Sequence, residues 1–167
     1  MTTSENPFVV VGQRGIERAR SDSGELMTPQ LEQLHRDLVD DGFVRYCCGP
    51  RDDPAVLLAY YEWPGYLDLV TIRSYERITA ARVPKPVDVF APQVAVWAYQ
   101  GPPEPTLRAL LHLVHPAHPT APTQTFPAPP ALHVPRALQR PLTIRLPNPS
   151  QRTTRAHRLA KAMLARR

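Results

Sequence analysis

Proline is the feature that most constrains how this chain can fold. Ten of its 21 prolines fall between Pro116 and Pro149. Because proline fixes φ and has no backbone N–H, such a segment cannot form an ordinary helix or a central strand. Pro116, Pro119 and Pro122 also recur every three residues, the period of a polyproline II helix. We therefore expect residues 116–149 to form an extended linker, or a belt along a domain, with one short candidate strand at 143–146.

Charge divides the chain near the same place. Residues 1–104 carry ten basic and all fifteen acidic side chains, a net charge of −5, whereas residues 105–167 carry ten basic and no acidic ones, a net charge of +10. This asymmetry indicates a polyanionic partner or an acidic protein surface. The alternative is that the basic tail neutralises the acidic part of its own chain.

The region before residue 116 has the pattern of a small α+β domain. Thr28 suits a helix N-cap, Pro29 the first helical position and Gly42 a C-cap, and leucines recur between them at helical spacing. A second amphipathic helix is predicted near residues 107–114. These signals place the first helix at about 28–41.

Strands are predicted at residues 43–48, 55–63, 66–73 and 94–99, while residues 74–83 fit either a short helix or a strand. A two-residue turn at Pro64-Gly65 sets Trp63 opposite Tyr66 and Tyr61 opposite Asp68. The predicted fold is α+β, with a small, mostly antiparallel sheet of about four strands and two or three helices.

A basic helix is predicted at the end of the chain. Ser150 can cap it, and its arginines lie largely outside an apolar stripe of Ala156, Leu159, Ala160, Met163 and Leu164. The expected organisation is an arm or loop over 1–27, the α+β domain over 28–115, the proline-rich linker or belt over 116–149, and the basic amphipathic helix over 150–167.

This layout predicts a non-enzymatic accessory protein that contacts nucleic acid or a nucleoprotein complex, mainly through phosphate. No aromatic residue follows Phe126, which argues against recognition by base stacking through the tail. The candidate phosphate contacts are Arg152, Arg155, Arg158, Lys161, Arg166 and Arg167. The same helix could instead pack on its own domain or lie on an anionic membrane.

The alternative function is a protein-interaction adaptor. Here the proline-rich segment or the apolar stripe of the C-terminal helix docks on a partner. The candidate partner-binding residues are Pro116, Pro119, Pro122, Leu159 and Met163.

Known catalytic and metal-binding patterns are absent from the sequence, and no cofactor is predicted. Cys47 and Cys48 are adjacent, so on a strand their thiols point to opposite faces and do not join His112, His115 and His118 around one metal ion. The predicted hairpin register likewise puts Glu62 and Asp68 on opposite faces. An enzyme or sensor with a groove on the aromatic sheet face, near Tyr61, Trp63 and Trp97, stays open as a third hypothesis.

The cysteines form no disulfide framework, and no apolar run is long enough to span a bilayer. The first residues also lack the pattern of a signal peptide. The expectation is a cytoplasmic protein.

Overall fold

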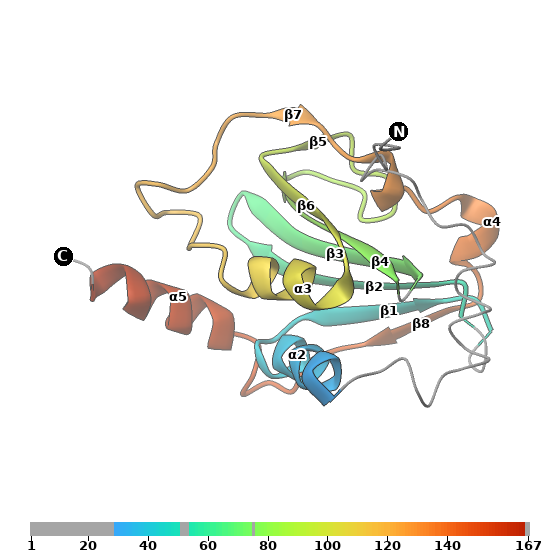
Figure 1. Cartoon of the computed structure of the whole chain (residues 1–167), viewed down its shortest axis with the longest axis horizontal. Coiled ribbons are helices and arrows are strands. Elements are labelled where there is room, and N and C mark those ends of the chain that lie inside the picture. Colours follow the sequence, from blue (N-terminus) through green and yellow to red (C-terminus); the bar gives the residue numbers. More distant parts are fainter. Residues whose placement is uncertain (1–28, 51–53, 75, 166–167) are drawn as a thin grey trace, which may run out of the picture.

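A six-stranded antiparallel sheet forms the centre of the α+β fold (Figure 1). The computed structural model describes residues 29–50, 54–74 and 76–165. The strand order is β6-β4-β3-β2-β1-β8, so β6 and β8 are the edges. The six strands are β1 (Val44–Cys48), β2 (Val56–Trp63), β3 (Tyr66–Ser74), β4 (Arg77–Pro84), β6 (Trp97–Gly101) and β8 (Leu142–Arg145).

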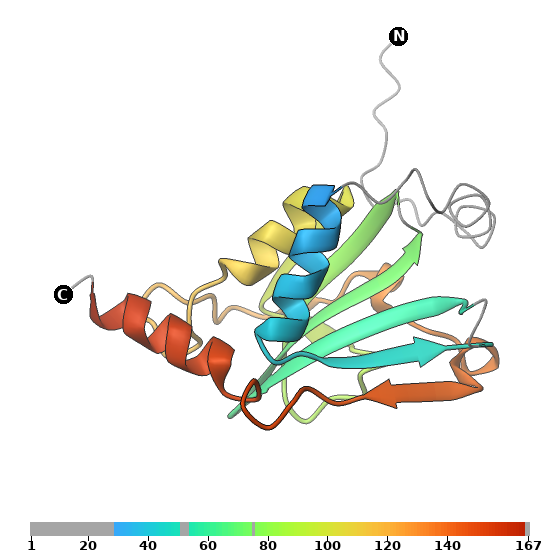
Figure 2. The same cartoon turned by 90° about the horizontal axis from the view of Figure 1, so that it is seen from below.

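Three helices cover one face of the sheet, which we call the helix face. Figure 2 shows α2 (blue) and α3 (yellow) lying across this face, with α5 (red) at one end of them. The core beneath them joins Leu38 of α2, Leu110 of α3 and Leu159 of α5 to Val70 and Ala80 of the sheet. The helices are α2 (Pro29–Asp40), α3 (Pro103–Leu111) and α5 (Thr154–Leu164).

The opposite face of the sheet, which we call the belt face, is covered by irregular chain. Its core joins Leu58, Leu69 and Val83 of the sheet to Phe90 and to Leu132 from the proline-rich region. The elements of this covering are β5 (Val94–Ala95), which pairs with β7 (Phe126–Pro127), the 3-10 helix η1 (Pro130–Leu132) and the short helix α4 (Arg136–Gln139).

The hairpin of β2 and β3 has the register that the sequence predicts. Trp63 pairs with Tyr66 and Tyr61 with Asp68. The first helix also begins at Pro29, and Gly42 follows its end with a φ of 98°. Both features follow from local sequence. Pro64-Gly65 favours a tight turn, which sets the hairpin register, and the glycine at 42 permits the positive φ that ends the helix.

The predicted sheet of about four strands is wrong, because the main sheet has six. In the segment 74–83, which the sequence left open, Ser74 is the last residue of β3, and residues 77–83 belong to strand β4, which lies between β3 and β6. The predicted strand at 94–99 divides into β5 and β6, which belong to different sheets. The sixth strand is β8, which lies near the C-terminal end of the proline-rich region and pairs with β1.

Strand β8 forms because prolines bound it without entering it. Pro141 precedes Leu142 and Pro147 follows the strand, so each of the four strand residues keeps its backbone N–H. An edge strand also needs hydrogen bonds on one side only, which suits such a short segment. The proline-rich region thus adds an edge to the sheet and covers its belt face, rather than leaving the fold.

No helix in the described part of the chain combines the length and the apolar character that crossing a membrane requires.

The close contact between Gly42 and the turn before α5 yields a stability prediction. A Cβ on Gly42 would overlap the backbone carbonyl of Gln151, in addition to the strain of a positive φ. Gly65 has a similar φ of 84° but nothing within 4 Å of the added atom. We expect Gly65→Ala to cost about 1–2 kcal/mol from φ alone, and Gly42→Ala to cost clearly more.

Urea unfolding of both variants measures this difference. Equal losses would mean that the 148–153 turn yields freely and does not hold the end of α2 in place.

Candidate functional site

Asp68 lies at the centre of an internal ion network. Its side chain on β3 is fully buried and faces Arg82, its register partner on β4. The Arg82 Nε lies 2.6 Å from Asp68 Oδ1 and the Arg82 Nη2 lies 2.9 Å from Oδ2. Trp63 Nε1 donates a third hydrogen bond to Oδ2 at 2.9 Å. A buried carboxylate is stable only when its oxygens are matched in this way.

Arg155 brings the C-terminal helix into this network. Its side chain is fully buried, although it is charged. Nη2 lies 3.0 Å from Asp68 Oδ2, and Nη1 lies 3.0 Å from Asp41 Oδ2 at the end of α2. The same guanidinium donates to the carbonyls of Leu110 and Leu111 at 2.8 and 3.2 Å. One side chain thus joins α2, β3, α3 and α5.

Arg158 adds a second contact from α5 to Asp41. Its Nε and Nη2 donate to the two oxygens of Asp41 at 3.1 and 2.7 Å, a bidentate pair. Arg158 is 42% exposed in its side chain, so it closes the solvent side of the network. A guanidinium can donate two parallel hydrogen bonds to one carboxylate, whereas the compact ammonium of lysine cannot match both oxygens in this way.

The network holds three guanidinium groups against two carboxylates. The excess positive charge faces the carbonyls of Leu110 and Leu111, which end α3. The C-terminus of a helix carries a partial negative charge, so this position favours arginine. The Arg155 guanidinium also lies 5.5 Å from the centre of the Phe43 ring. The charges are therefore compensated within the chain.

The predicted phosphate contacts divide into two groups in the structure. Arg155 and Arg158 are engaged by carboxylates of the same chain, so Arg155 can meet a phosphate only if α5 leaves its place. Arg152 and Lys161 are exposed. Arg166 and Arg167 lie outside the described residues.

The predicted partner-binding residues are likewise divided. Leu159 is 6% exposed and belongs to the helix-face core. Met163, Pro116 and Pro122 are half-buried, and Pro119 is exposed. The C-terminal end of α5 extends beyond the sheet in Figure 1 and presents Leu164 at 61% exposure.

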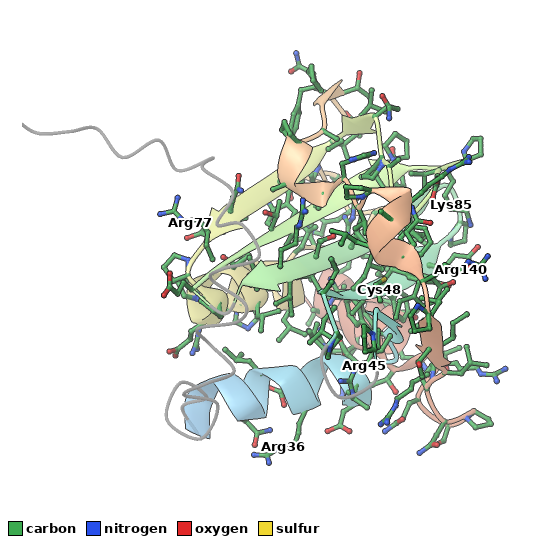
Figure 3. The ribbon with its side chains drawn as sticks, turned by 90° about the vertical axis from the view of Figure 1, so that its right-hand side faces the viewer. Arg36, Arg45, Cys48, Arg77, Lys85 and Arg140 are labelled. Atoms are coloured by element: carbon green, nitrogen blue, oxygen red, sulfur yellow. The ribbon has the colours of Figure 1, made fainter. Side chains whose placement is uncertain are left out.

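Three further arginines, which were not among the predicted contacts, lie on the segments that lead to α5. Together with Arg152 and Lys161 they form a set that we call the basic edge. All five side chains are exposed, and none makes an ion pair with another described residue. Arg140, which directly follows α4, lies at the periphery of the molecule in Figure 3. The basic edge consists of Arg136, Arg140, Arg145, Arg152 and Lys161.

The signal for this surface was present in the sequence as the lack of acidic residues after Glu104. Arg136, Arg140 and Arg145 were not selected because residues 116–149 were expected to form an extended linker or a belt, and the sequence did not show which of their side chains face solvent.

The cysteines and histidines come together in no metal site within the described residues. Cys47 is half-buried on the helix face, and Cys48 is fully buried. Burial raises the pKa of Cys48 to about 11, with a smaller contribution from Cys47. His115 packs edge-on against Trp63, and burial there, followed by the charge of Arg82, lowers the pKa of its imidazole.

A cavity of about 250 Å³ opens on the helix face at the β8 side of the sheet. Arg45, Arg145 and Cys47 are among its lining residues. Tyr61 and Trp63, near which the sequence placed a hypothetical groove, are buried in the helix-face core instead.

Comparison with models of known protein families, with curated proteins and with solved structures finds no match to this chain. Function must therefore be argued from its own geometry.

Loss of Arg155 should be far more costly than loss of a neighbouring exposed arginine. Arg155→Ala leaves two buried carboxylates short of donors, a change that costs about 3–5 kcal/mol in other proteins. Arg152→Ala, three residues earlier and exposed, should stay within about 0.5 kcal/mol of the parent. Chemical unfolding of the two variants checks this, and similar small losses in both would contradict the central role of the network.

The two cysteines should differ in reactivity because their environments differ. At pH 8, Cys48 is almost entirely a thiol, since its pKa is raised to about 11, and it is shielded from solvent. We expect iodoacetamide to modify Cys47 first and Cys48 only after unfolding. Mass spectrometry of Cys47→Ser and Cys48→Ser variants separates the two sites; rapid alkylation of the Cys47→Ser variant would contradict the burial of Cys48.

Proposed function

We propose that this protein is a non-enzymatic accessory protein whose basic edge binds nucleic acid or a nucleoprotein complex through phosphate. The observation that carries the proposal is the division of the cations that follow Glu104 into paired and solvent-facing groups. Arg108, Arg155 and Arg158 are paired with carboxylates, whereas Arg136, Arg140, Arg145, Arg152 and Lys161 face solvent without an ion pair among the described residues.

The arrangement of the basic edge suits a long anion better than a small one. Its members follow one another on α4, β8, the turn before α5 and α5 itself. Figure 1 shows α4 and α5 at opposite ends of β8, so the elements that carry these cations follow one another along one side of the molecule. A series of phosphates can contact such a line at several points, and each contact releases a counterion.

The chemistry of the basic edge favours backbone contacts over base recognition. Four of its five members are arginines, which bind phosphate in bidentate fashion. No aromatic residue lies in this part of the chain on which a base could stack. The expected binding is therefore strongly dependent on salt and weakly dependent on sequence.

The adaptor alternative has less support from the packing of α5. Leu159, the centre of the apolar stripe, is covered by the protein's own core. A partner could reach Leu159 only if α5 left its place in the core, and only the end of the stripe at Leu164 is exposed. The exposed cations need no such rearrangement.

A matched pair of double variants tests the proposal. Arg140→Gln with Arg152→Gln removes two charges of the basic edge, and Arg36→Gln with Arg108→Gln removes two exposed charges from α2 and α3. Both variants have the same net charge. We expect the first pair to flatten the plot of log K against log salt for duplex DNA by about 0.9 per lost phosphate contact, hence by about 2, and the second to leave the slope near that of the parent.

Fluorescence anisotropy with labelled duplex and single-stranded DNA gives the slopes. Equal effects of the two pairs would show that net charge alone drives binding. A parent protein without salt-dependent binding to either probe would refute the proposed function.

A further inference from the structure

The cavity at the β8 side of the helix face has a cationic end and an apolar end. Its first row of side chains crosses four strands in register: Arg145 of β8 pairs with Arg45, Arg45 with Ala59, and Ala59 with Val70. All four residues line the cavity. Arg145 is exposed, Arg45 is half-buried and Val70 is fully buried. Polarity thus falls steadily from the sheet edge inward.

A second row repeats this gradient two residues along each strand. Thr143 pairs with Cys47, Cys47 with Leu57, and Leu57 with Ile72, and these residues also line the cavity. Leu38 of α2 forms part of the wall. Because side chains two apart on a strand share a face, the two rows make one continuous floor. That floor is apolar at β2 and β3 and polar at β1 and β8.

The pairing of Arg45 with Arg145 is the unusual part of this floor. Like charges directly opposite one another on antiparallel strands oppose sheet formation. Burial and the charge of Arg145 both lower the pKa of the Arg45 guanidinium. Both arginine side chains line the cavity, and the planar fork of a guanidinium matches the two oxygens of a carboxylate.

The size of the cavity limits what can bind there. Its volume of about 250 Å³ lies below the ~300–1,000 Å³ of typical sites for drug-sized ligands. The apolar floor would leave a sugar or a base without partners for its polar groups. A short hydrocarbon chain or ring with one anionic group satisfies both ends.

We propose that this cavity is a binding site for a small apolar carboxylate, held by Arg45 and Arg145 at its head and by Ala59, Val70, Leu57 and Ile72 along its body. The site is separate in chemistry from the proposed nucleic-acid contacts, although Arg145 belongs to the basic edge as well. Cys47 lies in the floor and reports on occupancy through its alkylation rate.

Octanoate is the probe, with octanol and octylamine as matched compounds that lack the negative charge. Isothermal titration should show saturable one-to-one binding of octanoate, and affinity should rise about fourfold per methylene from hexanoate to octanoate as apolar surface is buried. Octanol should bind at least tenfold more weakly and octylamine more weakly still. Bound octanoate should slow the alkylation of Cys47 by iodoacetamide in proportion to occupancy.

Two variants place the ligand in this cavity. Arg145→Gln, which changes an exposed side chain, should weaken octanoate binding severalfold, and Arg45→Gln with Arg145→Gln should weaken it more, while octanol binding stays the same. The control Arg140→Gln with Arg152→Gln should leave octanoate binding unchanged. Thermal unfolding confirms that each variant is folded.

The proposal is overturned if octanoate binds no better than octylamine, if Cys47 is not protected at saturation, or if folded Arg145→Gln binds octanoate like the parent. These outcomes are independent of the DNA titrations, because Arg140 and Arg152, the residues changed in those titrations, do not line the cavity. If the protein binds DNA but not octanoate, the proposed function stands and the carboxylate site is refuted. If it binds octanoate but not DNA, the carboxylate site stands and the proposed function is refuted.

Discussion

Much of this structure depends on the pairing of Arg155 with Asp41 and Asp68. A buried charge is tolerated only when every donor and acceptor around it is satisfied, so this side chain specifies where its partners must lie. Its contacts tie the residue after α2, the first half of β3 and the last carbonyls of α3 to the C-terminal helix α5. The C-terminal helix is therefore an integral part of the core.

This network also separates two uses of arginine within one basic region. Arg155 and Arg158 face carboxylates at the centre of the molecule, while the basic edge faces water. Part of the positive charge of the chain holds the C-terminal helix on its own domain. The rest faces solvent, and there we propose that it contacts an anionic partner.

Strand β8 links the fold to both proposed sites. By pairing with β1 it brings Arg145 opposite Arg45 at the mouth of the cavity, and it carries the basic edge from α4 to α5. Both effects arise because the four residues Leu142–Arg145, which lie between Pro141 and Pro147, pair with β1. A proline-rich segment that stayed a free linker would supply neither.

The sequence by itself determined the features that depend on neighbouring residues. The helix from Pro29, the turn at Gly42 and the register of Tyr61 with Asp68 follow from local capping and turn chemistry. The α+β class follows from periodicity. Only the tertiary structure decided that residues 77–84 are a strand, that Leu142–Arg145 joins the sheet, and that Arg155 turns inward while Arg152 does not. The physical reason is that each of these outcomes depends on a partner far away in the chain: a strand needs an edge to pair with, and a buried arginine needs carboxylates that the fold brings to it.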